Sequence, residues 1–295
     1  MAKEPIIAVT GATGNIGHVI VEQLLKKGIK VRAIARTPGK LEPLKAKGAE
    51  TIALDVNDGS AMGRAFEGVK SVFMMIPPNM TAENFRLAQS QVALGLVTGA
   101  VRAGVKHVVL LSSIGAHLSE GTGPILGLHD FEERLKDSGI PAAFLRPCYF
   151  MENHLHAVPV IKGMGVYADA MAADYPIPQV ATKDIGLKAA ELLAAGATGT
   201  HYLYGPREYS MSESARILGA AAGKPDLKYV QASYVDLKKG LRRAGISEST
   251  ASAFVEMERG FNEGKIAPTQ PPAPANRGKT TLEEFAKDVF AAAFA

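Results

Sequence analysis

The chain has 295 residues, of which 47% are hydrophobic and 21% are charged, and its formal net charge is +4. This composition is typical of a soluble globular protein, and the charge is too small to indicate binding to nucleic acid. The single cysteine excludes an intramolecular disulfide and a cysteine-based zinc site. Because no apolar run is long enough to span a membrane and Met1–Pro5 lacks an apolar signal-type segment, we expect a cytoplasmic protein without membrane contact.

The first half of the chain predicts strands that alternate with helices. Apolar runs predict strands at residues 6–10, 30–35, 51–54, 71–76, 107–111 and 142–145. Helical periodicity predicts helices at 15–27, around 61–66, at 82–103 and at 128–138. Such alternation is typical of an α/β fold with a doubly wound parallel sheet of the Rossmann type.

The second half is less regular. Helices are expected near 184–195 and 212–222, and residues 225–261 indicate a short strand and two helices. The segment 266–276 contains four prolines and predicts an extended connector, after which a final helix begins at Thr281. We therefore expect a dinucleotide-binding domain over 1–150 and, over 151–295, a small α+β substrate cap intertwined with it.

A glycine-rich turn follows the first predicted strand. Gly11, Gly14 and Gly17 are spaced by three residues, and a helical pattern begins at once. Gly11 permits the sharp turn, Gly14 lets the backbone approach a pyrophosphate, and Gly17 lets the helix lie close to the sheet. The segment Gly11-Ala12-Thr13-Gly14-Asn15-Ile16-Gly17 is therefore the predicted dinucleotide-binding loop, with the helix amino terminus facing the anion.

Residues after the second strand indicate which dinucleotide binds. Folds that select NAD usually carry an Asp or Glu there, but this chain has Arg36, with Lys40 close behind. A guanidinium can bind a 2′-phosphate and stack on adenine, so we expect NADPH in preference to NADH. The alternative is a solvated arginine in a basic loop.

Later strand ends supply further candidates for the cleft. Asp55 and Val56 follow the third strand and are placed to meet the adenine edge, whereas Ile76 and Pro77 follow the fourth and are placed to border the nicotinamide ribose. Pro78 is a candidate wall of the substrate cleft. Each could equally be ordinary loop structure.

Taken together, these motifs resemble the NmrA-like group of atypical short-chain dehydrogenase/reductases, and in particular its quinone and azo-dye reductases. The resemblance rests on residues 10–17, 36–40, 76–78, 112–116, 129–141, 145–153 and 182–186. It extends over nearly the whole chain. It implies hydride transfer from a nicotinamide cofactor to a small conjugated acceptor.

The wider superfamily uses a Tyr-x-x-x-Lys pair as proton donor and electrostatic support. Here Ile125 and His129 occupy the corresponding positions, so ordinary alcohol–ketone chemistry is not expected. An imidazole at His129 could donate a proton or orient the nicotinamide ribose, and this makes it the catalytic candidate. The alternative is a helix-start histidine bonded to backbone. Ser113 could contact substrate or cap the next turn.

The segment Pro147–Asn153 resembles the family segment that wraps the nicotinamide end of the cofactor. Pro147, Tyr149, Phe150 and Asn153 are its cofactor-binding candidates, and Tyr149 is also a substrate candidate; core packing is the alternative. Cys148 is expected to be buried and inert.

His154 and His156 are expected to be surface or cleft-edge histidines, because no third metal ligand is apparent; no metal site is predicted.

The sequence thus predicts an NADPH-dependent reductase of quinones, azo compounds or related conjugated acceptors, acting on small molecules as a monomer or homodimer. One alternative is a redox sensor that binds NAD(P) without turnover, which the missing Tyr–Lys pair favours. A second is a reductase of a phenolic secondary metabolite, although relatives of that type generally keep a lysine where His129 stands.

Overall fold

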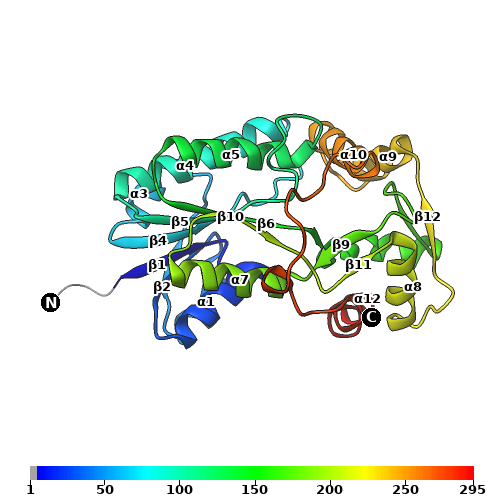
Figure 1. Ribbon diagram of the computed structural model, residues 1–295, viewed down its shortest axis with the longest axis horizontal. Coiled ribbons are helices and arrows are strands. Elements are labelled where there is room, and N and C mark those ends of the chain that lie inside the picture. The colour runs from blue at the N-terminus through cyan, green and yellow to red at the C-terminus, as the bar shows by residue number, and fades with distance from the viewer. Residues whose placement is uncertain (1–4) are drawn as a thin grey trace.

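The computed structural model describes residues 5–295, and within them seven parallel strands form a central sheet in the order β10-β6-β5-β4-β1-β2-β3 (Figure 1). Residues 1–4, on which most of the expectation about a signal segment rests, lie outside the described part. The strands of this sheet are β1 (Ile6–Thr10), β2 (Lys30–Ala35), β3 (Glu50–Ala53), β4 (Val69–Met74), β5 (His107–Leu111), β6 (Ala142–Pro147) and β10 (Gly199–Leu203).

Helices cover both faces of the sheet and bury its apolar strands. One layer contains α3 (Gly59–Ala65), α4 (Phe85–Ala103) and α5 (Leu126–Asp137), and the other contains α1 (Asn15–Lys26) and α7 (Thr182–Ala195), which pack on each other (Figure 1). Two apolar clusters result, one on each side of the sheet. Helix α2 (Pro38–Ala46) follows β2 directly. The predicted doubly wound α/β fold is confirmed.

The chain returns to this sheet after residue 150. Helix α7 and strand β10 belong to the second half of the sequence. Strand β10 nevertheless pairs in parallel with β6, with Gly199 opposite Ala143 and Leu203 opposite Pro147. The second half therefore contributes to the sheet as well as to the cap.

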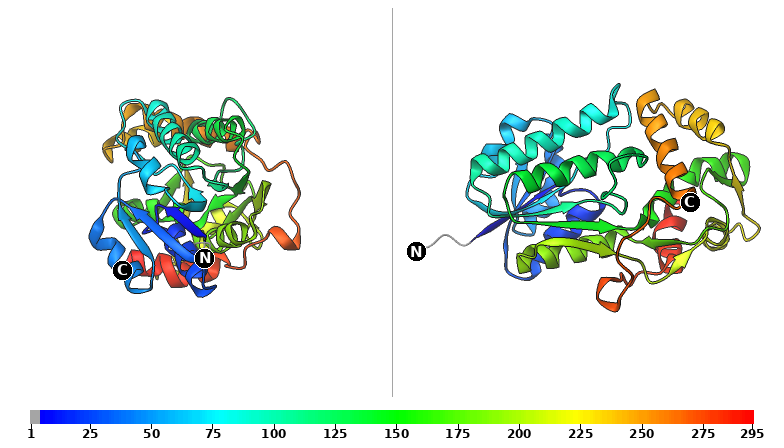
Figure 2. Two further views of the ribbon diagram at one scale, coloured as in Figure 1. Left: turned by 90° about the vertical axis from the view of Figure 1, so that its left-hand side faces the viewer. Right: turned by 45° about the horizontal axis from the view of Figure 1, so that its top comes forward.

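The remaining elements form the cap, which lies at the right-hand end of the molecule in Figure 1 and includes two small sheets, β11-β9-β7 and β12-β8 (Figures 1 and 2). Its elements are η1 (Gly123–Ile125), β7 (Tyr149–Phe150), η2 (Met151–Ala157), α6 (Val158–Met164), β8 (Val166–Asp169), β9 (Ile177–Val180), β11 (Glu208–Tyr209), α8 (Met211–Ala221), β12 (Lys228–Gln231), α9 (Tyr234–Arg243), α10 (Glu248–Asn262), η3 (Pro274–Asn276), α11 (Leu282–Phe285), η4 (Ala286–Phe290) and α12 (Ala291–Phe294).

Side-chain caps fix where several helices begin. Asn84 accepts a hydrogen bond from the N–H of Leu87 at the start of α4, and Ser247 accepts one from Thr250 at the start of α10. Thr281 and Glu284 form a capping box before α11, which begins one residue after the start expected at Thr281. The orientations of α4 and α10 determine the walls of the pocket described next.

Candidate functional site

The glycine turn between β1 and α1 has the tight geometry that its sequence predicts. Gly11 has φ +64°, and the N–H of Gly14 donates to the carbonyl oxygen of Gly11 at 3.0 Å. A Cβ on Gly17 would lie 2.1 Å from that same oxygen, which is closer than any side chain allows. The amino end of α1 has no side-chain cap at Gly14. These features leave backbone N–H groups free to bind an anion, and the loop therefore fits a dinucleotide pyrophosphate.

The other members of the predicted loop divide by exposure. Ala12 and Ile16 are buried in the core, whereas Asn15 is exposed and Thr13 is half-buried. The first two therefore shape the turn from beneath, and the latter pair lie on its accessible side.

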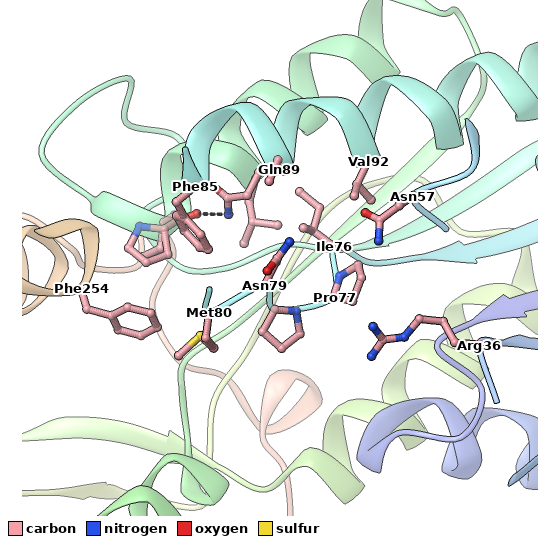
Figure 3. Close-up of a pocket in the computed structure, with 15 residues that line it drawn as sticks. Arg36, Asn57, Ile76, Pro77, Asn79, Met80, Phe85, Gln89, Val92 and Phe254 are labelled. Carbon is pink, nitrogen blue, oxygen red and sulfur yellow. Dashed lines mark hydrogen bonds between the residues drawn. The ribbon is translucent and has the colours of Figure 1, made fainter. Parts of the chain in front are cut away.

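Arg36 lies at the carboxyl end of β2, where the sequence placed the 2′-phosphate ligand. Its side chain is exposed and lines a pocket of about 290 Å³ that also receives Asn57, Ile76 and Pro77 (Figure 3). Lys40 is exposed in α2 but does not line this pocket. The strand end thus presents a cation and no carboxylate, as a 2′-phosphate requires.

The pocket extends from Arg36 to the cap, and its far end is apolar. Figure 3 shows Met80, Phe85 and Phe254 at the end opposite Arg36, with Ile76 and Pro77 between them. Its complete lining is Arg36, Asn57, Ile76, Pro77, Pro78, Asn79, Met80, Phe85, Ala88, Gln89, Val92, Pro124, Ile125, Leu128 and Phe254. Ile76, Pro77 and Pro78 therefore line this pocket, and their predicted contacts with the nicotinamide ribose and with substrate stay predictions. An elongated pocket with one cationic end and one apolar end suits an extended ligand with a phosphate at one end.

Hydrogen bonds hold the apolar end together. Gln89 donates through Nε2 to the carbonyl oxygen of Pro124 at 2.9 Å, which ties α4 to η1. The N–H of Phe85 donates to Oγ of Ser249, and the N–H of Ser247 donates to the carbonyl oxygen of Met80. The start of α10 is thereby fixed to the loop between β4 and α4.

Asp55 has a structural role in its own loop. Its Oδ1 accepts hydrogen bonds from the backbone N–H and from Nδ2 of Asn57, at 3.0 and 2.8 Å. Val56 is buried in the core, and Asn57 rather than either of them lines the pocket. The predicted contact of Asp55 with adenine stays a prediction. Asn57 is a pocket residue that was not predicted from the sequence.

His129 lies in the first turn of α5; the preceding residue, Leu128, lines the pocket, but His129 itself does not. Its Nδ1 is 2.9 Å from the carbonyl oxygen of Ala116, and it must donate there because a carbonyl oxygen only accepts. The neutral ring therefore has an unprotonated Nε2. This orientation agrees with the backbone-bonded alternative and leaves the second nitrogen available for another partner. His117, in the same loop as Ala116, has its pKa lowered by burial and by the charge of Arg146.

A buried ion pair lies beneath the loop that contains His117. Arg146 donates from Nε and Nη2 to the two oxygens of Glu132, at 2.9 and 2.5 Å, and Oγ of Ser112 donates to the same carboxylate at 2.5 Å. Arg146 also donates to the hydroxyl of Tyr202, which is 2.9 Å from that of Thr269. This network connects the ends of β5 and β6 with the proline-rich connector. Ser113 follows Ser112 and is half-buried.

The segment Pro147–Asn153 turns into the cap. Pro147 and Tyr149 are buried, and the Tyr149 ring packs against the His154 ring with 5.6 Å between the ring centroids. Phe150 and Asn153 are half-buried. None of these residues lines the 290 Å³ pocket, so their predicted cofactor and substrate contacts stay predictions.

His154 corrects one expectation. It is fully buried and is not a surface residue: its Nε2 lies 2.8 Å from Oε1 of Gln179, and its Nδ1 lies 2.6 Å from the hydroxyl of Tyr167. Because Gln179 Nε2 donates to Ser214, Gln179 Oε1 accepts from His154. Burial lowers the pKa of His154 to about 4. His156 is exposed, as expected.

Cys148 is buried, and burial raises the pKa of its thiol far above the ordinary value. Among residues 5–295 no group of three or more His, Cys, Asp or Glu side chains could hold a metal ion. In the same part of the chain, no helix combines the length and apolar character needed to cross a membrane.

The residues that form the apolar end of the pocket were not predicted from the sequence. Met80, Phe85, Gln89 and Phe254 come from the loop before α4, from α4 itself and from α10. The polar segment 79–84 beside two prolines signalled a loop near Met80. No local signal marks Phe254, since only the docking of α10 brings it to this pocket.

Comparison with known proteins places this chain in a family. Residues 3–286 match the NmrA-like family. The chain is 30% identical to an NAD(P)H azoreductase of Xenophilus azovorans, over 98% of this chain and 99% of that protein, and 30% identical to quinone oxidoreductase 2 of Escherichia coli, over 88% and 90%. The crystal structure of the Escherichia coli quinone oxidoreductase QOR2 complexed with NADPH superposes with a TM-score of 0.81 at 25% identity, covering 96% of this chain and 99% of that one. The protein belongs to the NmrA-like family.

Proposed function

We propose that the protein is an NADPH-dependent reductase that transfers hydride to a quinone, an azo compound or a related conjugated acceptor. The observation that carries this proposal is the continuity of one pocket, which begins at Arg36 and ends among Met80, Phe85 and Phe254 (Figure 3). Two relatives at 30% identity, named for azo and quinone reduction, support it.

The residues present fit the dinucleotide. A Cβ at Gly17 would overlap the Gly11 backbone, so the close turn exists only with glycine there, and this turn exposes the N–H groups that bind pyrophosphate. Arg36 would hold the 2′-phosphate, and Ile76 with Pro77 would border the ribose near the nicotinamide. When bound, the cofactor supplies the hydride.

The chain's own residues orient the reactants and exclude water. The apolar end of the pocket would take a flat conjugated acceptor, and its rings would pack against Phe85 and Phe254. Nε2 of His129 would relay a proton after hydride transfer, once it has itself been protonated from solvent. Such acceptors become stabilised anions on reduction, so this weak acid is sufficient.

The direct test measures NADPH oxidation with a panel of quinones and azo dyes at a fixed, low enzyme concentration. We expect many turnovers per enzyme molecule with at least one acceptor. Tight NADPH binding without turnover on any acceptor would refute the reductase and support a redox sensor. The sensor is the second candidate because buried Ile125 and His129 stand where the superfamily has tyrosine and lysine.

The role of His129 has a separate test. We expect His129→Ala to lower kcat by about 10²-fold, within the usual range for a general acid, while the Kd for NADPH stays within about twofold. His156→Ala, which alters an exposed histidine, is the matched control and should leave both constants unchanged. An unchanged kcat in His129→Ala would assign this histidine to the support of the loop at Ala116.

A further inference from the structure

Two carboxyl groups lie inside the cap, between α10 and the end of β8. Glu258 of α10 is only 7% exposed, and its Oε2 is buried without a hydrogen-bond partner. Asp169 ends β8, and its Oδ1 accepts a hydrogen bond from the N–H of Ala170 at 2.7 Å. An unpartnered carboxylate oxygen in the interior is costly, whereas a protonated carboxyl group is much less so. The structure around Glu258 is therefore one that suits its neutral form.

The groups facing this pair do not offset a negative charge. Burial, together with the charges of Asp169 and Glu258, raises the pKa of Tyr149 in β7, Tyr167 in β8 and Tyr229 in β12, so these three phenols stay neutral. Burial and the neighbouring Asp169 raise the pKa of Glu258, and burial raises that of Asp169 to about 6.

Two further groups lie nearby. His154, whose ring contacts Tyr149 and Tyr167, has its pKa lowered to about 4 by burial and is neutral above that pH. Arg259 is the next residue of α10, but it is exposed and its guanidinium lies over the Tyr234 ring, 5.1 Å from its centroid. His154 and the three phenols are therefore uncharged over the neutral range, and the two carboxyl groups are the members of this cluster whose charge changes with pH.

The helix that contains Glu258 is also a wall of the acceptor pocket. Phe254 lines that pocket and precedes Glu258 by four residues, so both side chains lie on the same face of α10. At its carboxyl end, Asn262 accepts from the N–H of Ala172 and donates to the carbonyl oxygen of Ala170. Those residues directly follow Asp169. A displacement of α10 at Glu258 would consequently move Phe254.

We propose that Asp169 and Glu258 are positioning residues that seat α10, and with it Phe254, against the acceptor pocket only while Glu258 carries its proton. Loss of that proton leaves two like charges among neutral phenols. Hydration of the Glu258 carboxylate then requires α10 to move away from the residues that end and follow β8, and this movement withdraws the Phe254 wall. The cap therefore closes over the pocket at lower pH and loosens as the pH rises.

A spectroscopic experiment tests this without any assumption about catalysis. The chain has no tryptophan, so Phe254→Trp introduces a single reporter at the pocket wall. From about pH 5 to pH 9 we expect its emission to shift to longer wavelength and its quenching by acrylamide to increase at least twofold. Adding Glu258→Gln should abolish the change, because the amide is neutral at every pH. Adding Glu256→Gln, at an exposed position of the same helix, should preserve it.

The partner carboxyl supplies a directional check. Asp169→Asn removes the charge that helps to raise the pKa of Glu258, so the fluorescence transition should move to lower pH. Any one of three results would overturn the proposal. The Phe254→Trp protein could show no fluorescence transition, the transition could persist when Glu258→Gln is added, or it could stay at the same pH when Asp169→Asn is added. Because these readings need no substrate, they fail or succeed independently of the proposed reductase activity.

Kinetics provide a second readout on the natural pocket wall. If only the seated form binds acceptor, the apparent KM is the intrinsic value divided by the seated fraction, and it rises by up to about tenfold per pH unit above the transition. We expect this rise in the wild type and in Glu256→Gln, with kcat much less affected, and a flat KM in Glu258→Gln. An equal rise of KM in Glu258→Gln would contradict the proposal.

Discussion

Replacement of Glu132 by glutamine should destabilise the protein strongly, because it breaks the ion pair beneath the candidate site. Glu132 is 1% exposed and Arg146 is 6% exposed, and the carboxylate accepts three hydrogen bonds, two of them from the guanidinium. Glutamine keeps the size of the side chain but leaves the buried guanidinium without a counter-charge. Removing one partner of a buried pair typically costs about 3–5 kcal/mol.

This energy converts into a measurable shift of the melting temperature. With an unfolding entropy of about 2.1 cal/mol/K per residue, a chain of 295 residues should lose about 5–8 °C in Tm. Differential scanning calorimetry at neutral pH measures the shift.

Glu133→Gln is the matched control, since it removes the neighbouring carboxylate of α5 from an exposed pair with Lys136 at 2.7 Å. Such a pair contributes less than about 1 kcal/mol. Equal melting temperatures for Glu132→Gln and Glu133→Gln would show that the buried pair stabilises the fold no more than the exposed one. Recovery of Tm when Arg146→Met and Glu132→Leu are combined would support it, because an apolar pair has no desolvation cost.

Three further outcomes follow from the geometry. Gly17→Ala should weaken NADPH binding at least about tenfold in a fluorescence titration, because the added Cβ would overlap the backbone oxygen of Gly11. Gly240→Ala is the control and should leave NADPH binding unchanged, because the space around Gly240 is open. Cys148 should resist iodoacetamide at about pH 8 in the folded protein and react readily in denaturant, because burial raises its thiol pKa; rapid labelling of the folded protein would contradict this. The folded state holds His154 neutral down to about pH 4, whereas histidine in the unfolded chain has its ordinary pKa of about 6.5. The unfolded chain therefore binds more protons between these two values, and the free energy of unfolding should fall as the pH decreases from about 6.5 to about 4. Denaturant titrations should show a smaller fall in His154→Gln.

Much of the sheet could be predicted because its signals are local. β2 and β5 begin and end at the expected residues: β5 is an apolar run followed by two serines, and β2 is apolar except for Lys30 and Arg32. Helix α2 was not predicted: it contains Pro43 and two lysines, and only Leu41 and Leu44 are buried. Its helical pattern is too weak to detect without its contacts to β2 and β3.

The candidate site divides in the same way. The glycine turn and Arg36 are consequences of a strand end followed by a helix, so neighbouring residues reveal them. His154 was wrongly expected at the surface because its partners, Tyr167 and Gln179, belong to later strands. Phe254 joins the pocket through the packing of α10 about 170 residues along the chain from Met80 and Phe85, and no local pattern encodes that contact.

We propose that this protein reduces a small conjugated acceptor with NADPH, and steady-state kinetics measure that activity. The measurement compares kcat/KM for NADPH and NADH with one quinone, in the wild type and in Arg36→Ala. A charged hydrogen bond contributes about 1.5–3 kcal/mol, so we expect NADPH to be preferred by about 10- to 100-fold in the wild type and the preference to disappear in the variant. Equal or better use of NADH by the wild-type protein, or no turnover with either cofactor, would contradict the account.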